Sequence, residues 1–331
     1  MSLRVGSLPR WQGFFMVCYL ALAGVAAWQT VLHTNTAADY FDAACEKQNV
    51  GNAGAKVIAK FVEQHKLIGP IIVSFVKGNF HLPSAKEASD AWAEVPRINL
   101  LQAQEETLAQ LWTWILLGLS LIYLVVASTV QKMDRGRNVL FALTGISMIF
   151  FLVGITATVM MISTTVRDFF GETPILQHKV RSISSVIGEL FTSGHWIFGS
   201  FITLFSIVTP SLKIILTFIA AETSLPVLSL KITEFLNVID KWSMTDVFVA
   251  AVILACFTIE SGVGTRIIPC RGLFYFAGYA LLSMTTTSLL TSLNSNDDSI
   301  PSNSWGQLKI PVAKKILAVV LFVSAVCMLK K

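Results

Sequence analysis

The sequence predicts an all-α polytopic membrane protein with about seven transmembrane helices. Two observations support this fold class. The 331 residues are 54% hydrophobic and only 14% charged, whereas about a quarter of the residues in a soluble domain are charged. Runs of about 20 apolar residues recur along the chain, and a helix of that length crosses the hydrocarbon of a bilayer. The net charge of +5 is modest and scattered, so no nucleic-acid partner is expected.

Seven segments are apolar enough to be spans, namely 13–32, 109–130, 139–163, 194–220, 243–259, 272–292 and 315–329. The first follows Arg4 and Arg10 and has features of a secretory signal peptide. Its apolar run is long, however, and the second span can return as its partner, so we expect a retained membrane anchor. The last segment precedes Lys330 and Lys331, and it either spans the membrane or only dips into it.

Basic residues in short loops predict the orientation, because such loops tend to stay on the cytoplasmic side. The loop QKMDRGR (131–137) carries three basic residues between the second and third spans. Together with the basic N-terminus, it predicts a cytoplasmic N-terminus and an outer location for 33–108. Apolar residues of VIAKFV (57–62) recur at helical spacing, so the outer segment is expected to form a small helical cap.

The chain is thereby divided into three parts. Residues 1–137 form a transmembrane hairpin with the insert 33–108, residues 138–292 form a four-helix membrane module, and residues 293–331 form a polar linker with a hydrophobic segment. Cys45 and Cys270 both fall on the outer side, where thiols can be oxidised. A disulfide between them would join the cap to the loop before the sixth span.

The stretch FSIVTPSLKIILTF (205–218) carries polar residues inside an apolar span. Pro210 has no N–H, so the carbonyl of Ser206 loses its helical partner and needs another donor in hydrocarbon. Lys213 lies two turns beyond Ser206 and therefore on the same face. Two interpretations are open. Either Lys213 reaches the lipid headgroups while Pro210 only kinks the helix, or these groups form a functional polar stripe that needs a counter-charge.

The next span offers that counter-charge in KWSMTDVFVAAVILACF (241–257), where Asp246 lies one turn inside the span. Ser243 and Asp246 also have the spacing of a helix-capping pair, and a capping carboxylate remains available to Lys213. Pairing would reduce the cost of placing either charge in the membrane. Thr286 and Thr287 add hydroxyls near the end of the sixth span, although such hydroxyls often bond only to their own helix.

Four motifs occur in an order that resembles one family. They are VRSISSVIGELFTSGHW (180–196), which contains Gly194; SIVTPSLK (206–213); KWSMTDVFV (241–249), which contains Trp242 and Met244; and GLFYFAGYALLSMTTTSLL (272–290). From about 139 to 292 the chain resembles a single membrane module of the paraquat-inducible protein A family. Many members of that family carry two modules and cysteine-rich zinc ribbons, neither of which occurs in this sequence.

The resemblance implies a multi-pass protein of the bacterial inner membrane that works with periplasmic mammalian-cell-entry (MCE) domain proteins and handles lipids. The residues at matching motif positions are Ser206, Pro210, Lys213, Trp242, Ser243 and Asp246, with Thr286 or Thr287 at the last polar position. On this basis we expect a lipid-transport subunit in which proton exchange within the Lys–Asp–hydroxyl network couples to movement. There is no glycine-rich phosphate loop, so ATP is not expected to supply the energy.

Two other classes of function are weighed against transport. A non-transporting scaffold would anchor an envelope complex through 33–108, and its polar network would only hold helices together. A membrane enzyme is not expected, because His65, His178 and His195 are not accompanied by a metal-spaced cluster or a nucleophile motif. No cofactor and no metal are expected.

Overall fold

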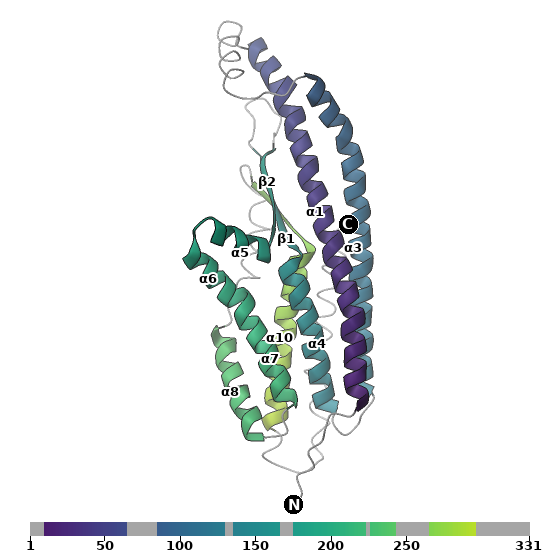
Figure 1. The fold of residues 1–331 in the computed structure, drawn as a ribbon, viewed down its shortest axis with the longest axis vertical. Helices are drawn as coiled ribbons and strands as arrows, with labels where there is room; N and C mark the ends of the chain where they lie inside the picture. The colour runs from purple at the N-terminus through teal and green to yellow at the C-terminus, as the bar shows by residue number, and fades with distance from the viewer. Residues whose placement is uncertain are drawn as a thin grey trace, which may run out of the picture.

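The computed structural model describes residues 10–64, 85–129, 135–165, 175–222, 226–242 and 265–295. Figure 1 shows an elongated bundle of helices with a small β-sheet near the middle of its long axis. We call the end of the membrane helices at which this sheet lies the sheet end, and the other the opposite end. The described part of the chain contains five helical segments long and apolar enough to cross a membrane, which are 14–48, 89–129, 136–156, 196–221 and 271–293.

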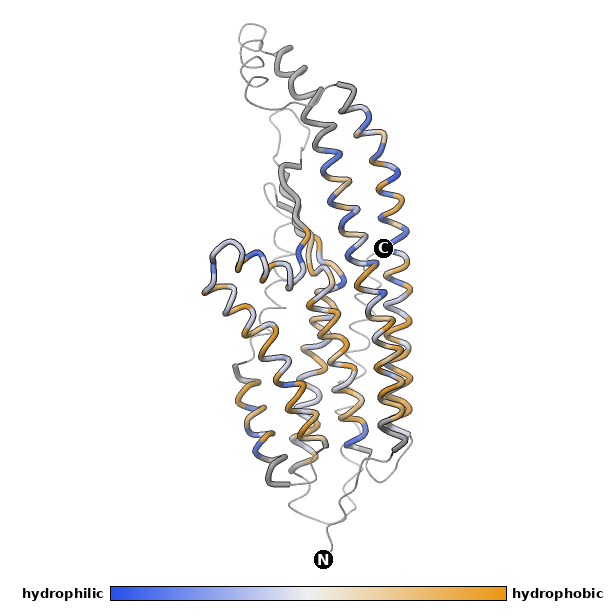
Figure 2. The backbone as a smooth tube through the Cα atoms, in the orientation of Figure 1, coloured by the Kyte–Doolittle hydropathy of each residue, from blue (hydrophilic) through white to orange (hydrophobic). Residues whose placement is uncertain are grey.

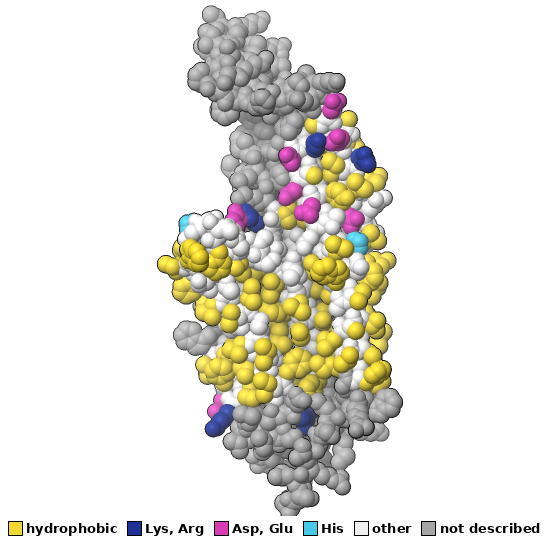
Figure 3. Space-filling model, in the orientation of Figure 1, with side chains coloured by type: hydrophobic (Ala, Val, Ile, Leu, Met, Phe, Trp, Pro, Cys, Tyr) yellow, Lys and Arg dark blue, Asp and Glu magenta, His cyan; other side chains and the backbone are white. Residues whose placement is uncertain are grey.

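These five segments overlap five of the seven predicted spans. The other two, 243–259 and 315–329, lie outside the described residues. Figure 3 shows a broad band of apolar side chains across the visible face of the bundle, with charged side chains above and below it. Exposed apolar side chains are what lipid requires of a span, so the band marks the surface that faces the membrane.

Helices α1 (Arg10–Gln64) and α3 (Ala85–Thr129) form a long antiparallel hairpin on one flank of the bundle (Figure 1). The rings of Tyr19 and Tyr123 stack at 4.2 Å, and the Tyr19 hydroxyl lies 3.0 Å from that of Ser120. The 55 residues of α1 correspond to about 80 Å. The hydrocarbon takes up only about 30 Å of this length, so both helices continue far beyond the sheet end.

This extension corrects the prediction of a separate small cap. Residues 33–64 and 85–108 are helical as expected, but they continue the two membrane helices without a break. We call this extension the stalk, and in Figure 2 hydrophilic residues recur along its coloured part, whereas the membrane part of the hairpin is mainly hydrophobic. Between its two helices, His33 Nδ1 and Glu105 are hydrogen-bonded at 2.5 Å, and Lys47 and Glu94 form an ion pair at 2.8 Å.

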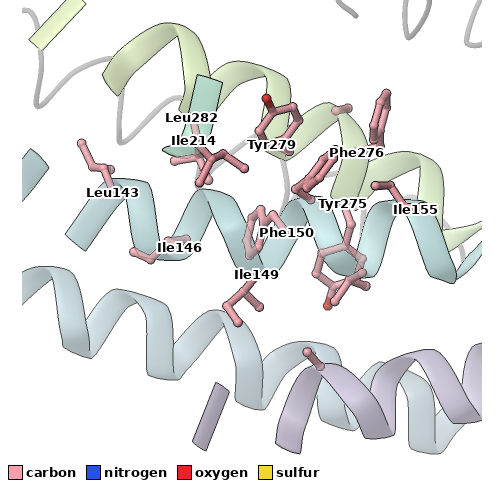
Figure 4. Close-up of a cluster of buried hydrophobic side chains, with 14 of the residues drawn as sticks. Leu143, Ile146, Ile149, Phe150, Ile155, Ile214, Tyr275, Phe276, Tyr279 and Leu282 are labelled. Atoms are coloured by element: carbon pink, nitrogen blue, oxygen red, sulfur yellow. The ribbon is translucent and has the colours of Figure 1, made fainter. Parts of the chain in front are cut away.

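Helices α4 (Arg135–Thr156) and α10 (Arg271–Ser295) are antiparallel and form the centre of the bundle. They are the most deeply buried of the five candidate spans. Aromatic pairs join them, with ring centroids 5.4 Å apart for Phe150 and Tyr275 and 4.9 Å apart for Phe151 and Tyr279 (Figure 4). The pair is the framework on which the remaining helices pack.

A three-stranded antiparallel sheet follows α4, which the all-α prediction did not include. Its strands are β1 (Thr158–Thr165), β2 (Ile175–Ser182) and β3 (Thr265–Pro269), in the order β2-β1-β3. The predicted span 139–163 was too long, because the apolar run TVMMIST continues the hydropathy of α4 although its β-branched residues favour a strand. Asn35 of α1 accepts hydrogen bonds from the amide and hydroxyl of Thr158 at 2.9 and 3.0 Å, which joins the stalk to the sheet.

The second flank consists of α5 (Ile183–Thr192), α6 (Trp196–Thr203), a π-helical turn (Leu204–Val208), α7 (Thr209–Glu222) and α8 (Pro226–Trp242). Gly194 has φ of 79°, a conformation that favours glycine, and it makes the tight turn between α5 and α6. Helix α7 packs against α4, α8 and α10. Helix α8 falls in the predicted loop between spans, and it carries both charged and apolar exposed residues.

Candidate functional site: a buried polar layer between the central helices

The candidate site is built around a π-helical turn in the helix formed by α6 and α7. Leu204–Val208 is a π-helical turn, and both the amide and the hydroxyl of Thr209 donate to the carbonyl of Leu204, the hydroxyl at 2.9 Å. Pro210 follows directly after this turn and has no N–H to donate, within a helical span that runs without interruption from Trp196 to Ala221. The polar residues predicted at this stretch therefore shape a local change of helix type. Single π-turns of this kind occur frequently at functional sites.

Lys213 lies less than one turn beyond the proline, and its side chain is inside the protein. Only 5% of its surface is exposed, whereas its neighbours Leu212 and Ile215 are 39% and 54% exposed. Ser206 is buried on the same face of the helix. A lysine that reached the lipid headgroups would lie on the exposed face, so its burial favours the interior polar stripe over the headgroup interpretation.

Contacts between α4 and α10 show which residues of the two helices lie at the same height along the bundle axis, which we call their level. Gly154 packs against the backbone of Phe276, and Gly136 lies against Leu293. Moving ten residues from Gly154 along α4 reaches Thr144, and moving ten residues from Phe276 along antiparallel α10 reaches Thr286. Thr144 and Thr286 therefore lie at the same level between these contacts.

Helix α7 is placed at the same level by its contacts with α4. The Arg137 guanidinium donates to the carbonyl of Ala221 at 2.8 Å, and the rings of Phe141 and Phe218 are 6.2 Å apart. Lys213 lies eight residues before Ala221, and Thr144 lies seven residues after Arg137. The lysine is therefore level with Thr144 of α4 and Thr286 of α10, about 12 Å from the opposite end of α7.

We call the buried hydroxyl and ammonium groups at this level the polar layer, which comprises Thr144, Ser147, Lys213, Ser283, Thr286 and Thr287. The apolar residues next to several of them, Leu143, Ile214 and Leu282, belong to one buried cluster contributed by α4, α7 and α10 (Figure 4). The layer therefore spans three helices. It is enclosed by apolar side chains rather than open to lipid.

Most hydroxyls of the layer bond to the backbone of their own helix. Thr286 and Thr287 donate to the carbonyl of Ser283 at 2.7 and 3.1 Å, and Thr144 donates to that of Leu140 at 2.8 Å. This is the ordinary behaviour of threonine in a span. These oxygens also keep the capacity to accept a hydrogen bond, because a hydroxyl that donates can still accept.

The structure brings some of the predicted site residues together and leaves others outside the described residues. Lys213, Thr286 and Thr287 share the polar layer, and Ser206 lies two turns from Lys213 toward the sheet end. Ser243, Met244 and Asp246 lie outside the described residues, so the Lys–Asp pairing stays a prediction. Trp242 is the last residue of α8.

Sequence reasoning missed the contribution of α4. Thr144 and Ser147 lie in the apolar stretch LFALTGISMIF (140–150), and both are buried. Two hydroxyls three residues apart in a span were the available signal, but such residues are common in membrane helices. The contacts of α4 with α7 and α10 show that they lie at the level of Lys213.

The predicted disulfide between Cys45 and Cys270 does not form in the structure, where Cys45 is a buried free thiol. Cys270 packs with Ala38 and Met161. Cys45 lies two helical turns beyond Ala38, which corresponds to about 10 Å. A disulfide requires Cα atoms within about 7 Å, so the two cysteines are at different levels of the molecule.

Among the residues that the structure describes, no group of three or more His, Cys, Asp or Glu side chains could hold a metal ion. The chemistry available in the polar layer is therefore that of an ammonium and several hydroxyls. The lysine and the hydroxyls can donate hydrogen bonds and the hydroxyls can also accept them, so such groups can bind water or an anionic oxygen.

Five apolar helices and a buried lysine at a helix break define a multi-pass membrane protein with a polar centre. Residues 147–294 match the family model described as paraquat-inducible protein A. This match confirms the resemblance for that part of the chain, which contains most of the polar layer but not α1 or α3. No curated protein and no solved structure matches the chain.

Proposed function

We propose that the protein is a subunit of an envelope lipid-transport system in the inner membrane. In this proposal it moves or loads phospholipid-type substrates for a periplasmic MCE-domain partner, with the N-terminus in the cytoplasm and without enzymatic activity. The paraquat-inducible protein A region supports the class of system. The observation that carries the proposal is the burial of Lys213 beside a helix break inside that region.

A purely structural role would not require a lysine at this position. Placing a charged side chain inside a membrane helix costs several kcal/mol or more unless it is compensated, whereas hydroxyls alone can join helices at little cost. An ammonium adds the capacity to change its charge by releasing a proton. We therefore propose that proton exchange at Lys213, with Asp246 and the hydroxyls as partners, is coupled to movement at the π-helical turn.

Complementation tests this proposal with a control from the same region. Cells that lack the gene and have an envelope-lipid defect would receive wild type, Lys213→Ala or Lys231→Ala, with membrane levels quantified. Lys231 is an exposed lysine on α8 and serves as the matched control. We expect Lys213→Ala to abolish rescue at normal protein levels and Lys231→Ala to rescue fully. Full rescue by Lys213→Ala would exclude the lysine from the mechanism.

The stalk favours a second candidate function, that of a membrane anchor for a periplasmic complex. It projects beyond the sheet end as two paired helices, a form suited to contact with another protein. Replacing residues 48–93 by a short glycine–serine loop would shorten the stalk while keeping the pair Lys47–Glu94 at the new tip. If the anchor is the function, this variant loses rescue while Lys213→Ala keeps it. Co-purification of an MCE-domain protein with each variant separates partner binding from transport.

A further inference from the structure

Ser147 faces α10 two turns from the close contact between Gly154 and Phe276. It lies seven residues, or two turns, before Gly154, so both residues are on the same face of α4. On α10, Ser283 lies two turns beyond Phe276, the residue that Gly154 touches. The two serines therefore meet at one level between the helices, and their side chains are 2% and 6% exposed.

The Ser147 hydroxyl differs from the other hydroxyls of the polar layer. It is fully buried and has no hydrogen-bond partner among the described residues, whereas Thr144, Thr286 and Thr287 all donate to carbonyls of their own helices. A buried hydroxyl without a partner is destabilising. Alanine would fill the same space without that cost, so the serine indicates a ligand for its hydroxyl.

We propose that Ser147 is a positioning residue that holds an internal water between α4 and α10 and orients it toward Lys213. This inference rests on the proposed proton exchange at Lys213. A water needs two to four polar partners and little space, and Ser147, Ser283 and the acceptor oxygens of the layer supply such partners. A lipid headgroup does not fit, because the surrounding side chains are almost completely buried.

The water would act as a relay for the proton of Lys213. In one transfer, an ammonium N–H bond breaks and a new O–H bond forms on the water, which passes a different proton to the next oxygen on the way to the aqueous phase. The water returns to its original composition and no electrons are exchanged. Ser147 fixes the orientation of the water by one hydrogen bond, and loss of that bond slows the transfer.

Proton flux in reconstituted vesicles tests the role of Ser147. The full-length protein would be placed in vesicles of phosphatidylethanolamine and phosphatidylglycerol that contain a pH-sensitive dye, and flux would be driven by an imposed potential. Ser147→Ala is compared with wild type, Lys213→Ala and Ser120→Ala. Ser120 is the control because it is also a buried serine of a membrane helix, but its hydroxyl already has partners in the carbonyl of Leu116 and the hydroxyl of Tyr19.

We expect Ser147→Ala to reduce proton flux about tenfold, the effect of losing about one hydrogen bond, without lowering the thermal midpoint. Ser120→Ala should retain the wild-type flux, and Lys213→Ala should have none. Wild-type flux in Ser147→Ala, or reduced flux together with a lower thermal midpoint, would overturn the role of Ser147 while leaving that of Lys213 intact. Wild-type protein with no flux above empty vesicles would contradict both.

Discussion

At Gly154 the two central helices approach too closely for any larger side chain. A Cβ atom added there would lie 2.9 Å from both the Cα and the backbone nitrogen of Phe276. Ordinary contacts of a Cβ atom begin near 3.4 Å, so Gly154→Ala forces α4 and α10 apart by at least about half an ångström. Because backbone atoms make the contact, no side-chain rotation can relieve it.

Two opposing effects determine how Gly154→Ala changes the free energy of unfolding. Overpacking costs about 1–3 kcal/mol, and replacing glycine by alanine inside a helix gains about 1 kcal/mol. Gly145→Ala on the same helix is the matched control, because its nearest neighbour, a ring carbon of Tyr123, would lie 3.9 Å away. The control keeps the helical gain without the clash, so the two variants should differ by about 1–3 kcal/mol.

Thermal unfolding of the purified full-length protein in detergent measures this difference. At one fixed scan rate, the midpoint of Gly154→Ala should lie about 2–6 °C below that of Gly145→Ala. The comparison uses the same helix and the same chemical change, so effects of detergent cancel. Equal midpoints would refute the packing of α4 against α10 and, with it, the register that places Ser147 and Thr144 in the polar layer.

Two further substitutions test contacts at the ends of the bundle. Asn35→Ala removes the bonds from Thr158 and should lower the free energy of unfolding by about 1–3 kcal/mol. The control Thr36→Ala removes a hydroxyl that bonds to its own helix and should change the free energy of unfolding by less than about 0.5 kcal/mol. Equal effects of the two substitutions in thermal unfolding would show that Asn35 does not join the stalk to the sheet. Arg137→Ala removes a charged donor from the carbonyl of Ala221 and should cost about 1.5–3 kcal/mol; an unchanged midpoint would contradict the docking of α7 on α4.

The membrane helices could be predicted from the sequence because exposure to lipid requires a strongly apolar composition. Five of the predicted spans correspond to helices of the structure. The sheet could not be predicted from the sequence, because β1 continues the apolar run of α4 and hydropathy does not distinguish a short buried strand from the end of a helix. The length of the stalk was missed for a related reason, since mixed polar and apolar residues indicate a helix but not its continuity with the span.

The polar site was partly predictable, to a degree that depended on residue type. Pro210 and Lys213 stand out in an apolar segment because each is costly there. Ser147 and Thr144 do not, because a single hydroxyl in a span usually bonds to its own helix. Their place at the level of Lys213 follows from the contacts of α4 with α7 and α10, which are a property of packing rather than of local sequence.

The central claim is that the buried ammonium of Lys213 is required for lipid movement, and transfer of a labelled phospholipid by the purified protein tests it most directly. Vesicles containing wild type, Lys213→Met or Lys231→Ala would be compared for transfer to acceptor vesicles under an imposed pH gradient. Methionine keeps most of the length and apolar contacts of lysine but removes its charge. We predict transfer at the level of empty vesicles for Lys213→Met and at the wild-type level for Lys231→Ala. Wild-type transfer by a stable Lys213→Met variant would contradict the account.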